Sequence, residues 1–93
     1  MKYFEVLVSI DKPNGTQIAW AYVNAKNKAQ AMRKIKEACP FVKIIDDEIN
    51  EYPENENSKI GDKVRLWYFE DVTVPGTWPC KMVEHHEEYE VIK

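Results

Sequence analysis

The sequence predicts an α+β fold: a mostly antiparallel sheet with one helix packed on one face, in the order ββαβββ. Two patterns indicate this fold. Apolar residues alternate with a period of two over the first 25 residues, and one amphipathic stretch with a period near 3.6 follows them. The 93 residues, of which 44% are hydrophobic, suffice for one small core, so we expect residues 1–93 to form a single domain.

Residues 2–25 are predicted to form a β-hairpin. Pro13-Asn14-Gly15 is a strong turn signal, because proline presets φ and the next two residues tolerate left-handed conformations. A two-residue loop at Asn14-Gly15 would place Val8 opposite Ala21. The even-numbered residues of the first strand then share a face with the odd-numbered residues of the second. We expect the helix to pack on this face, which carries Val6, Val8, Ala19, Ala21 and Val23.

The opposite face of the hairpin is too apolar to be left in water. We expect it to be covered by another segment, by a second copy of the chain in a homodimer, or by a partner. This aromatic face carries Tyr3, Leu7, Trp20 and Tyr22, and Trp67 is a candidate to join it.

Residues 27–39 are predicted to form the helix. Asn27 is a favourable N-cap, and Gln30 three residues later completes an imperfect capping box. Pro40 ends the helix, because proline lacks an N–H group and disfavours α geometry in the residue before it. The expected inward stripe is Ala31, Met32, Ile35, Ala38 and Cys39, and the expected outward side chains are Gln30, Arg33, Lys34 and Glu37.

The second half is predicted to contain a strand at 41–49, a polar loop at 50–60 and a C-terminal hairpin at 62–92. The run Leu66-Trp67-Tyr68-Phe69 is apolar at every position, which is typical of a strand flanked by layers on both sides.

Charged residues are segregated along the chain, although the net charge is only −3. The stretch 46–56 holds six acids and no base, and the stretch 26–36 holds five bases and no acid. The acidic residues are Asp46, Asp47, Glu48, Glu51, Glu54 and Glu56; the basic residues are Lys26, Lys28, Arg33, Lys34 and Lys36.

Three interpretations of this segregation remain open. Carboxylates could bind a basic protein surface, including one that normally holds nucleic acid, because they can occupy the arginine and lysine sites that phosphates fill. Alternatively, the helix lysines could contact phosphate while Trp20, Tyr22 or Trp67 stacks on bases. An isoelectric point near 5.4 makes this second interpretation the weaker one. In the third, both segments are simply solvated.

The sequence offers no convincing catalytic set or metal site. Cys80, His85 and His86 lie close together, but there is no C-x-x-C pair, and adjacent residues of a strand point to opposite faces. Cys39 falls at the helix C-terminus, where the dipole disfavours a thiolate. We therefore expect no catalytic residue, no metal and no cofactor, with a metal- or thiol-dependent enzyme as the remaining alternative.

The sequence also gives expectations about location. No apolar run approaches the ~20 residues of a membrane span, and the first residues lack the sections of a signal peptide. We expect a cytoplasmic protein that does not associate with membranes.

The first half of the chain resembles a pattern found in small proteins of phages and mobile elements. It begins Met-Lys-Tyr-Phe-Glu-Val, continues to a second strand ending Val23-Asn24-Ala25, and is followed by a helix starting Asn27-Lys28-Ala29-Gln30-Ala31 and a returning strand. Over residues 1–49 it is similar to the DpnD/PcfM-like proteins and to some compact anti-CRISPR proteins, although their usual acidic Ser-x-x-Glu-Ala helix start is absent. The resemblance implies an accessory protein that acts by occlusion, and it transfers no active-site residue.

The sequence as a whole therefore predicts a non-catalytic protein-binding module. Its expected role is that of a phage-type, anti-CRISPR-like inhibitor, which would block a nucleic-acid-handling host protein in the host cytoplasm through the acidic and aromatic residues. Direct binding of nucleic acid through the basic helix face is the alternative.

Overall fold

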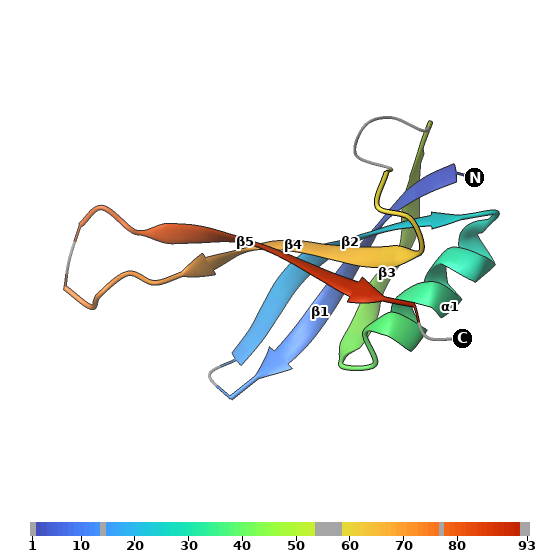
Figure 1. The fold of residues 1–93 in the computed structure, drawn as a ribbon. Helices are drawn as coiled ribbons and strands as arrows, with labels where there is room; N and C mark the ends of the chain where they lie inside the picture. The colour runs from blue at the N-terminus through green and yellow to red at the C-terminus, as the bar shows by residue number, and fades with distance from the viewer. Residues whose placement is uncertain (1, 14, 54–58, 77, 92–93) are drawn as a thin grey trace.

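The computed structural model contains one five-stranded antiparallel sheet and one helix, in the predicted order ββαβββ (Figure 1). It describes residues 2–13, 15–53, 59–76 and 78–91, without the side chains of 46–48. The elements are β1 (Lys2–Lys12), β2 (Gly15–Ala25), α1 (Lys28–Ala38), β3 (Val42–Tyr52), β4 (Lys63–Asp71) and β5 (Met82–Glu90). The strands lie in the order β3-β1-β2-β4-β5, so β1 and β2 are central and β3 and β5 are the edges.

The β1–β2 hairpin forms as predicted, but its register is shifted. Lys12 pairs with Gly15, and Val8 therefore lies opposite Ala19 rather than Ala21. The predicted register is wrong by two residues because the tight connection falls one position earlier than Asn14-Gly15. Gly15, with φ of 134°, is already the first residue of β2. A shift of two residues keeps every side chain on its predicted face, because side chains alternate with a period of two.

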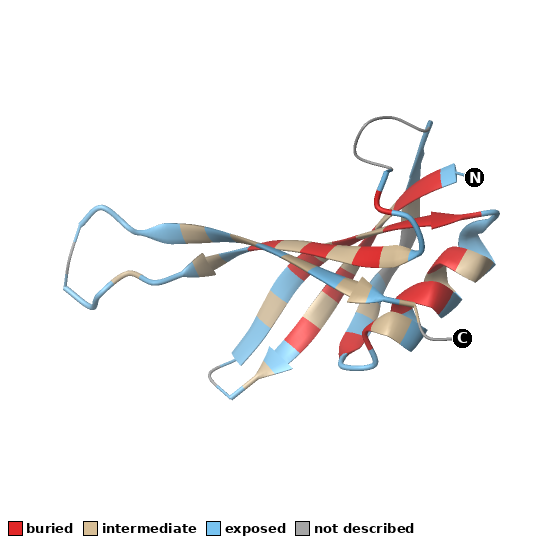
Figure 2. Cartoon of the chain, in the orientation of Figure 1, coloured by how far each residue is buried: buried red, intermediate tan, exposed pale blue. Residues whose placement is uncertain are grey.

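Helix α1 packs on the predicted face of the sheet and closes the core. Ala31, Ile35 and Cys39 are fully buried against the even-numbered residues of β1 and the odd-numbered residues of β2 (Figure 2). β4 adds Leu66 and Val64 to this core. Burying a side chain of this size stabilises a fold by about 1.5–3 kcal/mol.

The N-terminus of α1 is capped nearly as predicted. Asn27 Oδ1 accepts a hydrogen bond from Gln30 N (2.9 Å), and Gln30 Oε1 accepts one from Lys26 N (2.7 Å) rather than from the cap residue itself. These two bonds satisfy the backbone N–H groups of Gln30 and Lys26, at the point where the chain leaves β2.

The outward placement of Lys34 is wrong. Its side chain is buried, and Nζ donates to Asn24 O (3.0 Å) and pairs with Asp62 Oδ1 (3.1 Å). A lysine has a long apolar stem, which can be buried while the ammonium group reaches acceptors at the rim of the core. Here it links α1 to the end of β2 and to the start of β4.

Strand β3 is longer than the sequence indicates. The predicted loop at 50–60 is wrong in its first three residues, since Asn50, Glu51 and Tyr52 pair with β1 as the end of β3. These residues are polar because β3 is an edge strand, which needs no apolar pattern on its solvent side. The pairing with β1 also jumps from Val8↔Ile44 to Val6↔Ile49, so β3 has three extra residues at this irregularity.

Strands β4 and β5 form a hairpin arm that extends beyond the sheet (Figure 1). β2 pairs with β4 only from Trp20↔Trp67 to Val23↔Val64, whereas β4 and β5 stay paired as far as Asp71↔Met82. The arm contributes to an elongated molecule of 47 × 27 × 23 Å. Its outer part is largely exposed (Figure 2), and Trp78 near its tip is 86% exposed.

The two faces of the sheet differ. Helix α1 covers one face, and no second layer of described residues covers the other (Figure 1). The expectation of layers on both sides of residues 66–69 is therefore wrong: Leu66 and Tyr68 face the core, while Trp67 and Phe69 lie on the uncovered face. We call this uncovered face the open face.

Candidate functional site

The open face carries a row of aromatic side chains from three adjacent strands. Tyr3 of β1 and Tyr22 of β2 stack with ring centroids 5.6 Å apart. Trp20 and Trp67 lie 5.2 Å apart across the β2–β4 pairing, and Phe69 meets Trp67 edge to face at 5.1 Å. The row leads from the centre of the sheet onto the arm. Tyr3 itself is buried, at 4% exposed, whereas Trp20, Tyr22 and Trp67 are partly exposed and Phe69 is 39% exposed. Accessible aromatic surface of this kind is characteristic of contact sites.

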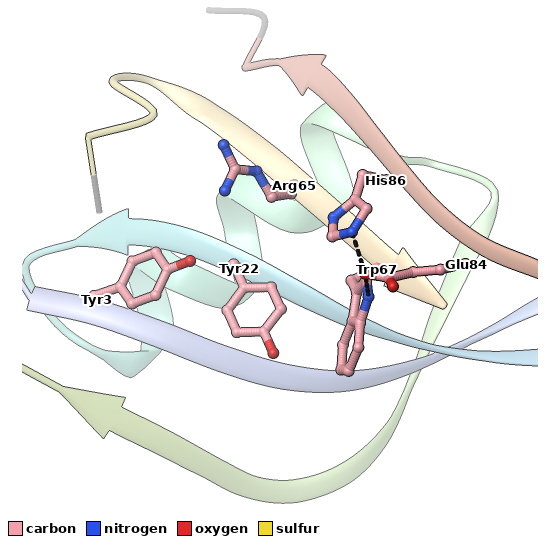
Figure 3. Close-up of a pocket in the computed structure, with 6 residues that line it drawn as sticks. All are labelled: Tyr3, Tyr22, Arg65, Trp67, Glu84 and His86. Carbon is pink, nitrogen blue, oxygen red and sulfur yellow. Dashed lines mark hydrogen bonds and ion pairs between the residues drawn. The ribbon is translucent and has the colours of Figure 1, made fainter. Parts of the chain in front are cut away.

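A pocket of about 310 Å³ opens in this row (Figure 3). Its volume is at the lower end of the ~300–1,000 Å³ typical of small-ligand sites, so it has room for one side chain or small group. Rings form much of its wall, and a carboxylate and a guanidinium group lie among them (Figure 3). The lining residues are Tyr3, Tyr22, Arg65, Trp67, Glu84 and His86.

Hydrogen bonds to carboxylates hold two of the aromatic rings, those of Trp67 and Tyr22, in place. Glu84 Oε1 accepts from Trp67 Nε1 (2.8 Å) and contacts His86 Nε2, as the dashed lines in Figure 3 show. The bond from Trp67, and then the contact with His86, hold the pKa of Glu84 below its usual range, so the carboxyl group is anionic at neutral pH. Behind the pocket, Glu5 accepts from Tyr22 Oη (2.7 Å) and from Asn50 Nδ2 (3.0 Å). Burial, and then the bond to Glu5, raise the pKa of Tyr22.

The guanidinium group of Arg65 is already paired. Its Nη2 lies 2.9 Å from Glu88 Oε1 across the β4–β5 ladder, and this contact holds the pKa of Glu88 below its usual range. Burial raises the pKa of Tyr3, and the charge of Arg65 opposes that effect.

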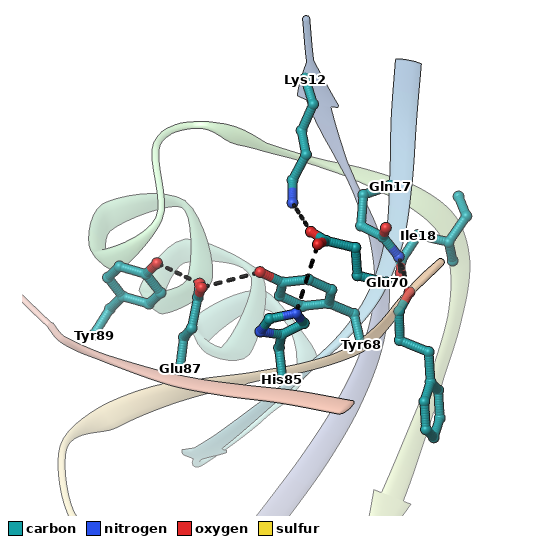
Figure 4. Close-up of polar contacts among 9 residues, drawn as sticks. Lys12, Gln17, Ile18, Tyr68, Glu70, His85, Glu87 and Tyr89 are labelled. Carbon is teal, nitrogen blue, oxygen red and sulfur yellow. Dashed lines mark hydrogen bonds and ion pairs between the residues drawn. The ribbon is translucent and has the colours of Figure 1, made fainter. Parts of the chain in front are cut away.

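A second polar cluster lies on the helix side of β4 and β5 (Figure 4). Glu87 accepts from Tyr68 (3.0 Å) and Tyr89 (2.7 Å), and His85 stacks on Tyr68 at 5.0 Å. Burial, and then the bond to Glu87, raise the pKa of Tyr68, whereas the bond to Glu87, and then burial, raise the pKa of Tyr89. Both hydroxyls are therefore neutral donors at neutral pH. The cluster joins β5 to the core, and we interpret it as structural.

The predicted acidic surface is only partly described. Glu51 is exposed on β3 and pairs with Lys2 (2.9 Å). Asp46, Asp47 and Glu48 fall at the irregularity of β3, where only the backbone is described. Glu54 and Glu56 lie outside the described residues.

The predicted aromatic residues are brought together, with additions. Tyr3, Trp20, Tyr22 and Trp67 form the row, and Leu7 pairs with Trp20 beside it. Arg65, Glu84, His86 and Phe69 were not predicted to join this site. The β4–β5 ladder brings Arg65 to Glu88 and Trp67 to His86. Aligning β4 with β5 by their register would have identified these residues. The long connection between the two strands, however, leaves that register undefined in the sequence.

The basic residues and the aromatic row do not form one site. Lys26, Lys28, Arg33 and Lys36 belong to α1 or to the turn before it, on the side of the sheet away from the row. Lys34 is buried, and Arg33 pairs with Glu37 (3.9 Å). The interpretation in which helix lysines bind phosphate while Trp20, Tyr22 or Trp67 stacks on bases requires both sets on one surface, and the fold separates them.

The thiols and imidazoles also lie apart. Cys39 is buried in the core and Cys80 is exposed in the connection between β4 and β5. His85 and His86 point to opposite faces, as the alternation of a strand predicts. In the part of the chain that the structure describes, no group of three or more His, Cys, Asp or Glu side chains could hold a metal ion.

Comparison with known proteins identifies no relative of this chain. No protein-family model, curated protein or solved structure matches this chain, so the resemblance of residues 1–49 to phage accessory proteins stays a prediction. Within the described residues, no helix has the length and apolar character needed to cross a bilayer.

Proposed function

We propose that this protein is a non-catalytic binding module that docks on a protein partner through its open face. The observation that supports this most directly is the aromatic row, which is organised by hydrogen bonds yet left uncovered by any described layer. Rigid, partly exposed aromatic side chains such as Trp20, Tyr22 and Trp67 are among the residue types that dominate binding energy at protein interfaces.

The charge of the open face supports a basic partner. Among described residues, six carboxylates on this face stand against three cations, which favours association with a positively charged surface. The carboxylates are Glu5, Asp11, Asp71, Glu84, Glu88 and Glu90, and the cations are Lys43, Lys63 and Arg65.

The more specific proposal is that the partner handles nucleic acid and that this protein inhibits it. A protein surface that binds nucleic acid is rich in arginine and lysine, and carboxylates can compete for those groups with phosphate. The resemblance of the first half to phage accessory proteins is the other support for this role.

The test compares two phenylalanines of similar exposure on different sides of the molecule. Phe69 on the open face is 39% exposed, and Phe41, in the turn just before β3, is 45% exposed. Immobilised wild type, Phe69→Ala and Phe41→Ala are incubated with nuclease-treated bacterial lysate, and the affinity of the captured protein is then measured. We expect Phe69→Ala to weaken binding about tenfold, as for an interface aromatic, and Phe41→Ala to leave it unchanged.

Circular dichroism of both variants provides the control for folding. Equal binding by wild type and Phe69→Ala would contradict the proposal, as would a captured species that disappears on nuclease treatment. A concentration-dependent sedimentation coefficient that Phe69→Ala abolishes would instead identify a second copy of the chain as the occupant of the open face.

A further inference from the structure

We infer that the pocket between Tyr22, Trp67 and Glu84 receives the guanidinium group of an arginine side chain from the partner. The inference rests on the proposed function, because it names the chemistry that the partner presents. Three properties of the pocket support it: the aromatic rings in its walls, its charge and its size.

The walls suit a flat cation. Tyr3, Tyr22 and Trp67 line the pocket (Figure 3), and because Tyr3 is only 4% exposed, Tyr22 and Trp67 offer most of the ring surface. The electron-rich face of an aromatic ring attracts a cation within about 6 Å. Guanidinium is planar and more weakly hydrated than ammonium, so it stacks on rings at a lower cost of desolvation. A volume of about 310 Å³ accommodates one such side chain and excludes a large cofactor.

The charged groups around the pocket favour a cation over an anion. Of the charged groups, Glu84 and Arg65 line the pocket, and Glu5, Glu88 and Lys63 adjoin it. Both cations pair with the same carboxylate, since Arg65 lies 2.9 Å and Lys63 3.9 Å from Glu88. Among the described residues, no lysine or arginine pairs with Glu84. Its contacts with Trp67 and His86 both involve Oε1. Its Oε2 therefore remains for an incoming N–H donor, with which it forms a charge-assisted hydrogen bond.

These features also distinguish arginine from a nucleotide. A base could stack on the same rings, but its phosphate would meet an excess of carboxylates. The two occupants make opposite predictions for Arg65. Removing its charge strengthens the binding of a cation and weakens the binding of an anion.

The experiment uses the whole protein and a short peptide, acetyl-Gly-Gly-Arg-Gly-Gly-amide. Binding is followed by NMR at the Nε1–H resonance of Trp67, which reports directly on the bond to Glu84. A single arginine side chain is expected to bind with a Kd on the order of 1 mM. The same peptide with citrulline, which has nearly the same shape and no charge, is expected to bind at least about tenfold more weakly.

Variants test the assigned groups. Glu84→Gln keeps an oxygen acceptor for Trp67 and is expected to weaken peptide binding about tenfold. Glu90→Gln, on the same face of β5 but outside the pocket, is the matched control and is expected to change nothing. Arg65→Gln is expected to tighten binding a few-fold (roughly, from Coulomb's law at an exposed site).

Three results would overturn the inference: equal shifts with the arginine and citrulline peptides, binding that Glu84→Gln leaves unchanged, or a response of Trp67 to adenosine monophosphate that Arg65→Gln weakens. The citrulline comparison uses wild-type protein, so it decides the matter even if a variant does not fold. Any of these results rejects arginine as the occupant of the pocket. The proposed function is tested separately, by the comparison of partner binding to Phe69→Ala and Phe41→Ala.

Discussion

The aromatic side chains of the open face are fixed before any partner arrives. Tyr22 donates to Glu5 and stacks on Tyr3, while Trp67 donates to Glu84 and contacts both Trp20 and Phe69. Tyr22 and Trp67 are thus each held by one polar and at least one apolar contact, and the other rings of the row pack against them. Binding to such a surface immobilises few additional side chains, each of which would otherwise cost about 0.5–1.5 kcal/mol. This arrangement favours recognition of a partner with a defined shape.

Several buried or hydrogen-bonded groups make the fold sensitive to alkaline pH. Burial, and then the charge of Glu87, raise the pKa of the Cys39 thiol to about 12, and hydrogen bonds to carboxylates contribute to the raised pKa values of Tyr22 and Tyr89. Above pH 9 the unfolded chain loses these protons while the folded protein keeps them. The unfolded state then binds fewer protons, so the free energy of unfolding falls as pH rises.

We therefore expect urea denaturation to give a free energy of unfolding that decreases from pH 9 to pH 12. The slope contributed by each fully shifted group is at most about 1.4 kcal/mol per pH unit. The variant Tyr89→Phe removes one of these titrations and is expected to flatten the profile. A free energy that stays constant between pH 8 and pH 11 would contradict this account.

The helix depends on its first turn. α1 has only 11 residues and no acidic residue in its first turn, so the side chain of Asn27 provides the main local stabilisation of its N-terminus. The reciprocal bond from Lys26 N to Gln30 ties this turn to the end of β2. Because Ala31 follows directly and is buried in the core, fraying here would open the packing of α1 on the sheet.

We expect Asn27→Ala to lower the free energy of unfolding by about 1 kcal/mol, within the 0.5–2 kcal/mol range for lost N-caps. Lys28→Ala, one residue later and exposed, is the control and is expected to have little effect. Urea denaturation measures both. A loss with Asn27→Ala no larger than that with Lys28→Ala would show that tertiary packing alone holds the turn.

Elements with strong local patterns were the easiest to predict. The alternation in β1 and β2 assigned both faces correctly even though the register was wrong, because a shift of two residues preserves alternation. The end of β3 and the burial of Lys34 depend on partners distant in the sequence, Glu5 for Asn50 and Asp62 for Lys34. The pocket depends on the strand order, since it joins β1 and β2 to β4 and β5, and no local pattern encodes that order.

The strand order also places acid-rich segments at both edges of the sheet. β3 contains the stretch 46–51, and β5 contains Glu84, Glu87, Glu88 and Glu90. Charged edge strands oppose pairing with other chains, so part of the acidic character protects the sheet from aggregation. Much of the apolar surface that remains exposed, including Phe69, Val72 and Trp78, is on the open face and on the arm, which favours these regions as the contact surface for a specific partner.

The fold divides into a core that carries the stability and an arm that does not. The buried cluster extends along β4 only as far as Tyr68, whereas Val72, Trp78 and Met82 on the arm are exposed (Figure 2). We expect Leu66→Ala to lower the free energy of unfolding by about 2–5 kcal/mol, because it removes a fully buried side chain.

On the arm, Trp78→Ser is expected to change the free energy of unfolding by less than about 0.5 kcal/mol. Urea denaturation compares the two variants, and binding of the captured partner is measured in parallel. An exposed tryptophan contributes little to the stability of its own chain. Tryptophan is also enriched at binding interfaces, so we expect Trp78→Ser to weaken the binding of the partner. A loss of stability of 2 kcal/mol or more with Trp78→Ser would show instead that the arm folds back and packs against the body of the protein.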